Sequence, residues 1–163
     1  MLIKKLELEN FRQYIGYQTI GFSTDREKNV TVLIGVNTSG KTTLVRAFEW
    51  VLYGTNEFDD KILLNKNVAE NMQVGETKAV KGALTIEHDS GTGTPITYVI
   101  ERKQIYTSTG TSVRANVSEA KISYFQPDGQ TKTILNTDFN TNIERILPRR
   151  LSNYFFFGGE RVG

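Results

Sequence analysis

A short run of residues from Gly35 to Thr42 has the composition of a phosphate-binding loop, with the pattern G-x-x-x-x-G-K-[ST]. Small residues let successive backbone N–H groups curl around an anion, and a helix that begins at Lys41 directs the positive end of its dipole to the same place. The Lys41 ammonium group can then reach the β- and γ-phosphates of a nucleotide, and the Thr42 hydroxyl can ligate Mg²⁺. The spacing therefore predicts a nucleotide site with Mg²⁺. Its candidate binding residues are Gly35, Asn37, Thr38, Ser39, Gly40, Lys41, Thr42 and Thr43.

The residues on either side of this loop predict a strand before it and a helix after it. Val30–Ile34 is a β-branched apolar run, which is typical of a strand buried on both faces of a parallel sheet. From Lys41 onward, apolar residues recur with the spacing of one helix face, and Gly54 follows where a helix C-cap belongs. Trp50 lies off this stripe, so we expect it to mark a contact surface for another part of the protein. The apolar positions are Leu44, Ala47, Phe48, Val51 and Leu52.

The rest of the chain has the pattern of strands with two further helices. Alternating residues predict strands around 6–8 and over 17–22. Between about Val80 and Leu135, alternation and turn sequences predict an antiparallel lobe of about four to six strands beside the first sheet. Helical patterns occur near 68–72 and over 138–147, and we expect the aromatic run that starts at Tyr154 to be a core strand. The expected fold class is α/β.

The composition limits the class of protein. The chain has 163 residues, of which 38% are hydrophobic and 23% charged, enough for one globular domain with a core. It has no cysteine, which excludes disulfides and thiolate metal sites. It has no apolar run of membrane-spanning length, and charges interrupt its first residues, so we expect no signal peptide, no membrane partner and a cytoplasmic location. A net charge of +2 neither demands nor excludes a nucleic-acid partner.

Several nucleotide-dependent classes require motifs that this chain lacks. A GTPase needs N-K-x-D to read guanine, and the nearest string, Asn65–Val68, lacks the aspartate. A small-molecule kinase needs an arginine-rich lid, which the region after residue 55 does not contain. The acidic Walker B strand of an ATPase is also missing, because Thr97–Glu101 lies in the hairpin region and Arg102 follows it. The chain therefore carries half of an ATPase site, and the acidic residues that position water must come from elsewhere in the parent protein or from a partner.

Three segments resemble the N-terminal head segment of the SMC-like ATPases, a group that includes SMC proteins, RecF, SbcC and double-strand-break repair ATPases. They are Leu8–Arg12, Gly16–Phe22 and Val32–Leu44, and the last of them contains the loop motif. The closing segment 154–161, in which a phenylalanine run leads into Gly-Gly-Glu, is most similar to the DndD family of DNA sulfur-modification proteins. The resemblance covers essentially the whole chain.

The resemblance implies a P-loop NTPase fold, namely the N-terminal half of an ABC-type ATPase head with an adjoining antiparallel β lobe. Residues 1–163 would form the N-terminal lobe of a split head, with the phosphate loop at 35–42, the β lobe at about 80–135 and a Q-loop-like end at 154–161. In this family a coiled coil follows, and the C-terminal half supplies the signature motif and Walker B. Two heads sandwich two ATP molecules and clamp DNA. The implied partners are therefore that C-terminal half, a second head, DNA, and other DNA-modification or repair proteins.

The same resemblance implies roles for residues outside the loop motif. Arg12 would approach the nucleotide from the end of the first strand. Glu160 would stand where the family's Q-loop glutamine reaches toward Mg²⁺ and the attacking water, as a candidate catalytic and metal-site residue together with Thr42. Two positions depart from the family pattern, because Thr38 occupies a place that is often glycine and Gly158 replaces an aspartate. The metal-side role of the closing loop therefore rests on Glu160 alone.

The main interpretation is an ATP- and Mg²⁺-binding half-site that hydrolyses ATP once it is joined to the C-terminal half and dimerised. Two alternatives stay open. One is a nucleotide-gated scaffold with little turnover, and the other is a stand-alone small P-loop kinase. The main interpretation expects this chain alone to be nearly inactive, whereas the kinase requires multiple turnovers from these 163 residues.

Overall fold

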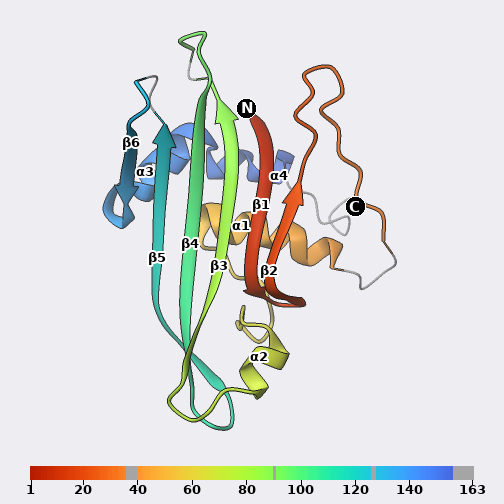
Figure 1. The fold of residues 1–163 in the computed structure, drawn as a ribbon, viewed down its shortest axis with the longest axis vertical. Coiled ribbons are helices and arrows are strands. Elements are labelled where there is room, and N and C mark those ends of the chain that lie inside the picture. The colour runs from red at the N-terminus through yellow and green to blue at the C-terminus, as the bar shows by residue number, and fades with distance from the viewer. Residues whose placement is uncertain (36–39, 90, 126–127, 156–163) are drawn as a thin grey trace.

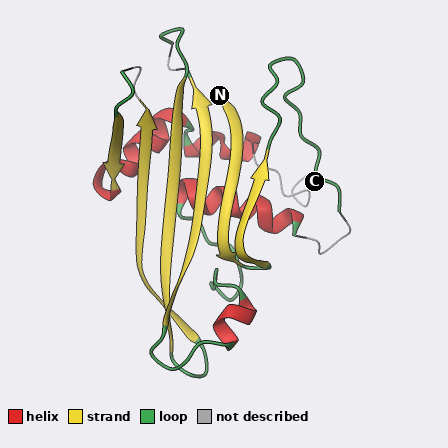
Figure 2. Ribbon diagram, viewed as in Figure 1, coloured by secondary structure: helices red, strands yellow, loops and turns green. Residues whose placement is uncertain are grey.

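The described residues form one antiparallel sheet with helices packed on one of its faces (Figure 1). The structure is a computed structural model, and it describes residues 1–35, 40–89, 91–125 and 128–155. In Figure 2 the longer helices lie behind the sheet, while a short helix stands near its lower end. No helix in these four ranges is long and apolar enough to cross a membrane.

Six strands pair in the order β2-β1-β3-β4-β5-β6, and every pair is antiparallel. The strands are β1 (Leu2–Phe11), β2 (Tyr14–Gly21), β3 (Thr77–His88), β4 (Ile96–Ser108), β5 (Val113–Phe125) and β6 (Thr131–Leu135). Strand β1 lies between β2 and β3 although β3 follows much later in the chain. Pairing on both sides therefore fixes the end of β1, from which the turn to β2 departs.

Helix α1 (Lys41–Tyr53) begins at the lysine and ends at Gly54, as the sequence predicts. Gly54 has a φ of +72°, and its N–H donates to the Trp50 carbonyl at 2.8 Å, which closes the last turn. The other helices are α2 (Lys66–Glu70), α3 (Asn136–Ile146), the 3-10 turn η1 (Arg149–Leu151) and α4 (Ser152–Phe155). The predicted helices near 68–72 and over 138–147 are thus confirmed, with small shifts at their ends.

The core lies between the sheet and helices α1 and α3. Alternate residues of the strands point toward the helices and are buried, as expected for a sheet with one covered face. At Gly82 on β3, an added Cβ would lie 2.5 Å from Val51 and 2.9 Å from Trp50, so this glycine lets α1 approach the sheet closely. The main buried residues of this layer are Leu6, Leu8, Val80, Leu84, Ile100 and Ile122 from the sheet, Leu44, Ala47, Phe48, Val51 and Leu52 from α1, and Phe139 and Ile143 from α3.

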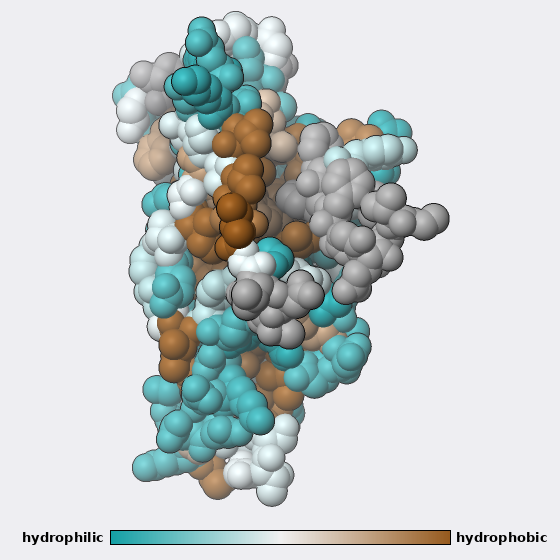
Figure 3. Space-filling view, turned by 90° about the vertical axis from the view of Figure 1, so that its right-hand side faces the viewer, coloured by the Kyte–Doolittle hydropathy of each residue, from teal (hydrophilic) through white to brown (hydrophobic). Residues whose placement is uncertain are grey.

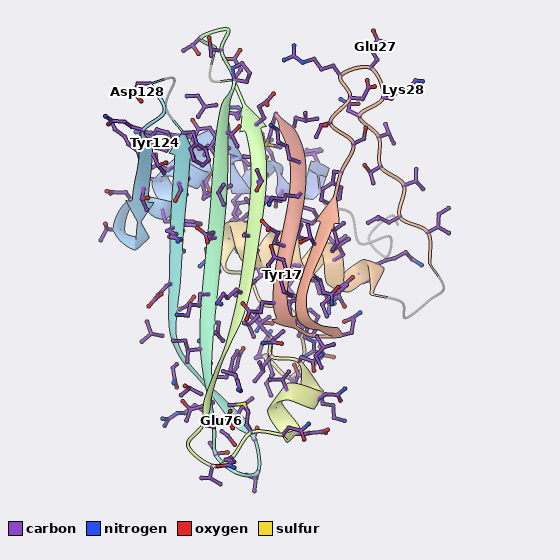
Figure 4. All side chains as sticks on the ribbon, in the orientation of Figure 1. Tyr17, Glu27, Lys28, Glu76, Tyr124 and Asp128 are labelled. Atoms are coloured by element: carbon purple, nitrogen blue, oxygen red, sulfur yellow. The ribbon has the colours of Figure 1, made fainter. Side chains whose placement is uncertain are left out.

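No described helix covers the opposite face of the sheet (Figure 1). This face carries charged side chains in pairs. Lys81 lies 2.7 Å from Glu9, and Lys121 lies 3.0 Å from Glu101, each pair bridging neighbouring strands. Tyr17, which is labelled in Figure 4, donates a hydrogen bond from its hydroxyl to the carboxylate of a glutamate on β1. Both signs of charge are therefore present on this face.

The apolar run Val30–Ile34 does not form the buried parallel strand that the sequence predicts. It lies in the loop between β2 and α1, where Val30 is 78% and Ile34 is 94% exposed. Figure 4 shows Glu27 and Lys28 at the tip of this loop, away from the sheet, and Figure 3 shows a band of hydrophobic surface on this side of the molecule. The prediction was wrong because a buried strand needs neighbours for its backbone hydrogen bonds, and no described strand flanks this run.

Three other expectations differ from the structure. The strands predicted between about 80 and 135 are present, but β3 pairs with β1, so they belong to the same sheet as the first strands. Trp50 is 3% exposed, with its ring centroid 5.4 Å from that of Phe11, because the sheet covers a wider arc of α1 than one stripe. Tyr154 belongs to helix α4 and is 72% exposed, so it is not part of a core strand. Residues 156 and 157 of the same aromatic run lie outside the described residues.

Replacing Gly82 with alanine should lower the free energy of unfolding by about 1–3 kcal/mol, because the added methyl group overlaps Val51 and Trp50 and α1 must shift. Gly21 is the matched control, since it ends strand β2 and a Cβ there meets nothing within 4 Å. We expect Gly21→Ala to change stability by at most about 0.5 kcal/mol. Urea denaturation of both variants measures the difference, and equal stabilities would contradict the close approach at Gly82.

Candidate functional site

The N-terminus of α1 lacks a side-chain cap. Gly40 is the N-cap residue, with a φ of +100°, and its carbonyl accepts a hydrogen bond from the Leu44 N–H at 2.9 Å. Within the part of the chain that the structure describes, no side chain caps this end and no acidic residue lies in the first turn. Among the described residues, therefore, no side chain neutralises the positive end of the helix dipole, and this end is suited to an anion.

Lys41 connects the two ends of the loop motif. Its Nζ donates a hydrogen bond to the carbonyl oxygen of Gly35. Lys41 and Thr42 are exposed and Thr43 is half-buried, so the ammonium and hydroxyl groups are accessible at the start of α1. The candidate residues Asn37, Thr38 and Ser39 lie outside the described residues.

The turn between β1 and β2 packs directly on Gly40. The Tyr14 hydroxyl donates to the Gly40 carbonyl at 3.3 Å, and burial raises the pKa of this tyrosine above its ordinary value. A Cβ at position 40 would lie 2.5 Å from Nε2 of Gln13. This turn therefore places the first residues of α1 relative to the end of β1.

Arg12 lies in the same turn, with a φ of +50° that is uncommon for residues other than glycine. Its Nη1 donates to both carboxylate oxygens of Asp60 at 2.9 Å and to the Ile62 carbonyl at 2.6 Å. The centre of its guanidinium lies 4.3 Å from the centroid of the Phe58 ring. The residue that the resemblance singled out thus lies in the turn whose next two residues reach Gly40, and a distant segment of the chain holds its side chain.

That distant segment, residues 58–65, is attached to the end of β1 through the backbone. The Arg12 N–H donates to the Leu63 carbonyl, and the Asn65 N–H donates to the Asn10 carbonyl, both at 2.8 Å. The Asn65 side chain also donates to the Arg12 carbonyl. These hydrogen bonds fix the position of the segment, and with it the groups that the segment presents to Arg12.

Asp60 pairs with Arg12 as a carboxylate. Burial by itself raises the pKa of the Asp60 carboxyl, but the hydrogen bonds from the Ile62 N–H and from the Arg12 guanidinium outweigh it and hold the pKa below its ordinary value. The Ile62 N–H donates to Oδ1 of Asp60 at 3.0 Å. The carboxylate is therefore ionised at neutral pH and oriented by its own loop.

A cavity of about 820 Å³ opens beside Arg12 and Gln13. Its walls come from the turn after β1, from α2 and from the turn between β4 and β5. Asn65, which is 5% exposed, lines it, and its side chain accepts the Val68 N–H and so caps α2. Gln13 lies between this cavity and Gly40, but none of the described residues of the loop motif lines the cavity.

The structure describes only some of the predicted site residues. The described part of the motif is brought together at the start of α1, and Arg12 lies in the turn that contacts it. Glu160 lies outside the described residues, so its expected place near Thr42 stays a prediction. In the described ranges, no three His, Asp or Glu side chains are grouped so that they could hold a metal ion. The motif residues that are described are Gly35, Gly40, Lys41, Thr42 and Thr43.

Sequence reasoning missed three residues of this arrangement, namely Gln13, Tyr14 and Asp60. Gln13 and Tyr14 directly follow Arg12, so their position next to a candidate site residue could have indicated that they belong to the site. Asp60 is 48 positions from Arg12, in a polar stretch without periodicity. Only the folded backbone brings these two side chains together.

A family model described as an AAA domain matches residues 5–162. The chain belongs to this AAA-domain family. The Chromosome partition protein Smc of Halothermothrix orenii is 34% identical to this AAA domain over 93 residues, which are 55% of this chain and 7% of that protein. The chain thus spans a small part of the curated relative it matches. The matched relative is itself an Smc protein, one of the group that the three sequence segments resemble.

Two solved structures also match the AAA domain at low identity. One, from work on ATP-driven dimerization and DNA-stimulated activation of SMC ATPases, has a TM-score of 0.48 at 19% identity and covers 99% of this chain and 85% of that chain. The other is the SmcHead bound to the C-winged helix domain of ScpA. It has a TM-score of 0.37 at 22% identity, and the match covers 90% of this chain and 40% of that chain. The family match, the loop motif before α1 and the helix-covered sheet give the fold class as α/β, of the P-loop NTPase type.

Gly40→Ala should destabilise the AAA domain more than Gly16→Ala does. Both glycines have a positive φ, +100° and +64°, so each alanine introduces backbone strain of about 1–2 kcal/mol. Only at position 40 does the new Cβ also meet side chains, at 2.5 Å from Gln13 and 3.0 Å from Tyr14, whereas Gly16 has nothing within 4 Å. Thermal denaturation compares the two variants. A Gly40 variant as stable as the Gly16 variant would contradict the packing of the turn on Gly40.

Proposed function

We propose that this chain is the ATP- and Mg²⁺-binding half of an SMC-like ATPase head. The observation that carries the proposal is the N-terminus of α1, which has glycine as its cap and no side-chain cap among the described residues, where Lys41 and Thr42 are exposed and Lys41 reaches back to Gly35. Such a helix end, preceded by a loop of small residues, binds the phosphates of a nucleotide through backbone N–H groups. Membership of the AAA-domain family supports the same assignment.

In this proposal each residue of the motif has its own task. The loop that starts at Gly35 surrounds the phosphates, and Lys41 exchanges its contact with the Gly35 carbonyl for phosphate oxygens. Thr42 holds Mg²⁺, and one hydroxyl is sufficient because this ion keeps waters and phosphate oxygens as its other ligands. When bound, Mg²⁺ neutralises charge on the phosphates. Further phosphate contacts are assigned to Asn37, Thr38, Ser39, Gly40 and Thr43.

Two residues outside the motif belong to the same proposal. Arg12 adds positive charge from the turn that packs on Gly40, and its guanidinium has the planar geometry that suits phosphate oxygens. Glu160 is assigned to the metal and water side of the site, with Gly158 in place of the aspartate that the DndD family has there. Arg12 would therefore act on the phosphates and Glu160 on the attacking water.

We also propose that a further segment completes the head. The exposed apolar run Val30–Ile34 supports this, because a soluble domain seldom exposes such a run unless another surface covers it. The Smc relative is many times longer than the matched region. In the proposal the C-terminal half of the head packs here and supplies the signature motif and Walker B, and ATP joins two such heads.

The pathway is proposed to be one that acts on DNA in the cytoplasm. The similarity of segment 154–161 to the DndD family favours DNA sulfur modification, with repair or phage defence as related roles. The uncovered face of the sheet carries charges of both signs in salt bridges, so it does not offer the uniformly basic surface that tracks a DNA backbone. DNA contact is therefore proposed for the assembled dimer and not for this face alone.

Lys41→Ala should abolish ATP binding, because the ammonium that contacts the β- and γ-phosphates is lost. The matched control is Lys66→Ala, since Lys66 is also the first residue of a helix and its side chain is 86% exposed. Titration of the intact protein with a fluorescent ATP analogue in Mg²⁺ measures both affinities. Unchanged affinity of the Lys41 variant would show that the nucleotide does not use this loop.

Hydrolysis kinetics separate the proposal from its two alternatives. The intact protein should hydrolyse bound ATP in a single-turnover experiment, whereas a nucleotide-gated scaffold would retain it. These 163 residues alone should show multiple-turnover activity near background, because the acidic Walker B strand is missing from them. Sustained turnover by these residues alone would favour the stand-alone kinase instead.

A further inference from the structure

Only one nitrogen of the Arg12 guanidinium is occupied by the described residues. Nη1 donates to Asp60 and to the Ile62 carbonyl, while Nε and Nη2 have no acceptor in the described part of the chain. The Arg12 side chain is 28% exposed and lines the cavity beside Gln13. One side of the guanidinium is thus held by protein, and the Nε–Nη2 edge has no acceptor among the described residues.

Asp60 is oriented by a hydrogen bond within its own segment, and the same segment also binds the backbone of Arg12. The Ile62 N–H donates to Oδ1 of Asp60 at 3.0 Å, and the Leu63 carbonyl accepts the Arg12 N–H at 2.8 Å. The segment therefore contacts both the backbone and the side chain of Arg12. Such a double attachment selects one rotamer of a side chain that otherwise has many.

The ring of Phe58 restrains the guanidinium from a second direction. Arg12 lies 4.3 Å and Arg46 of α1 lies 5.0 Å from its centroid, and Phe58 is 5% exposed. The ring also packs edge-on against Phe11 at 6.0 Å between centroids. A buried ring thus links the position of Arg12 to the helix that starts at Lys41.

We propose that Asp60 is a positioning residue that turns the Nε–Nη2 edge of Arg12 toward a phosphate oxygen of the bound nucleotide. This inference rests on the proposed function. Arginine binds phosphate best through two nitrogens of one edge, and Asp60 leaves such an edge open by engaging Nη1 only. Asp60 also reduces the net charge near the phosphates, but its side chain is 52% exposed, so solvent screens this opposing effect. The ordering of Arg12 before binding is the larger effect.

The test compares Asp60→Ala with Asp60→Asn in the intact protein, by titration with a fluorescent ATP analogue in Mg²⁺. Asp60→Ala should weaken binding by about three- to tenfold, because Arg12 must then be ordered when the nucleotide binds. Asp60→Asn should stay within about twofold of the parent, because its side-chain oxygen can still accept from Arg12 and from the Ile62 N–H. Asp59→Ala is the matched control, since Asp59 is exposed and its side chain makes no hydrogen bond or ion pair with a described residue.

A double variant shows whether the effect passes through the arginine. In an Arg12→Ala background, Asp60→Ala should cause no further loss, because there is no guanidinium left to position. Equal or tighter binding by Asp60→Ala, or a loss in Asp60→Asn as large as in Asp60→Ala, would overturn the positioning role. Asp60→Ser replaces the alanine variant if that variant does not fold by circular dichroism.

The outcome for Lys41→Ala distinguishes failure of this inference from failure of the proposed function. If Lys41→Ala abolishes binding while Asp60→Ala does not change it, only the role of Asp60 is wrong. If Lys41→Ala leaves binding unchanged, the nucleotide site itself is wrong and the role of Asp60 falls with it.

Discussion

The contact between the β1–β2 turn and Gly40 is the constraint on which the candidate site depends. The sheet holds α1 along its length, and Gly82 sets how close the helix lies. This packing positions the middle of α1, and a separate contact positions its first turn. Gln13 and Tyr14 meet Gly40 at its end, so the first turn of α1, and Lys41 with it, has a defined place beside β1.

The end of β1 is bent so that it can make this contact. Asn10 and Arg12 both have a positive φ, of +54° and +50°, and the pairing with β2 is irregular between Glu9 and Phe11. Such a backbone is strained, and it persists where hydrogen bonds on several sides determine it. Here those bonds come from the segment that carries Leu63. The bend thus joins three parts of the chain at one place, namely the turn, that segment and the loop motif.

The sequence predicted the elements whose causes are local. The stripe of α1, its end at Gly54 and the alternating strands follow from the residues of each segment alone. The predictions failed where the structure of a segment depends on which other elements pack against it. Val30–Ile34 has the composition of a buried strand and no described neighbour, and Trp50 is buried because β1 and β3 cover that side of the helix. Asp60 could not be chosen from the sequence, because its role depends on a contact across 48 positions.

The N-termini of helices α1, α2 and α3 differ in the side chains that stabilise them, and this difference bears on the function of α1. Helix α2 has the side chain of Asn65 as its cap, and α3 has Asp138 in its first turn. Helix α1 has glycine as its cap and no acidic residue in that turn. Relative to a side-chain cap, a glycine cap costs a helix only a few tenths of a kcal/mol, and the first amides of α1 have no side-chain acceptor among the described residues. A bound anion supplies that acceptor, so the free energy that α1 forgoes in the empty state is recovered when a phosphate binds. The stability of this helix end and the occupancy of the site are therefore coupled.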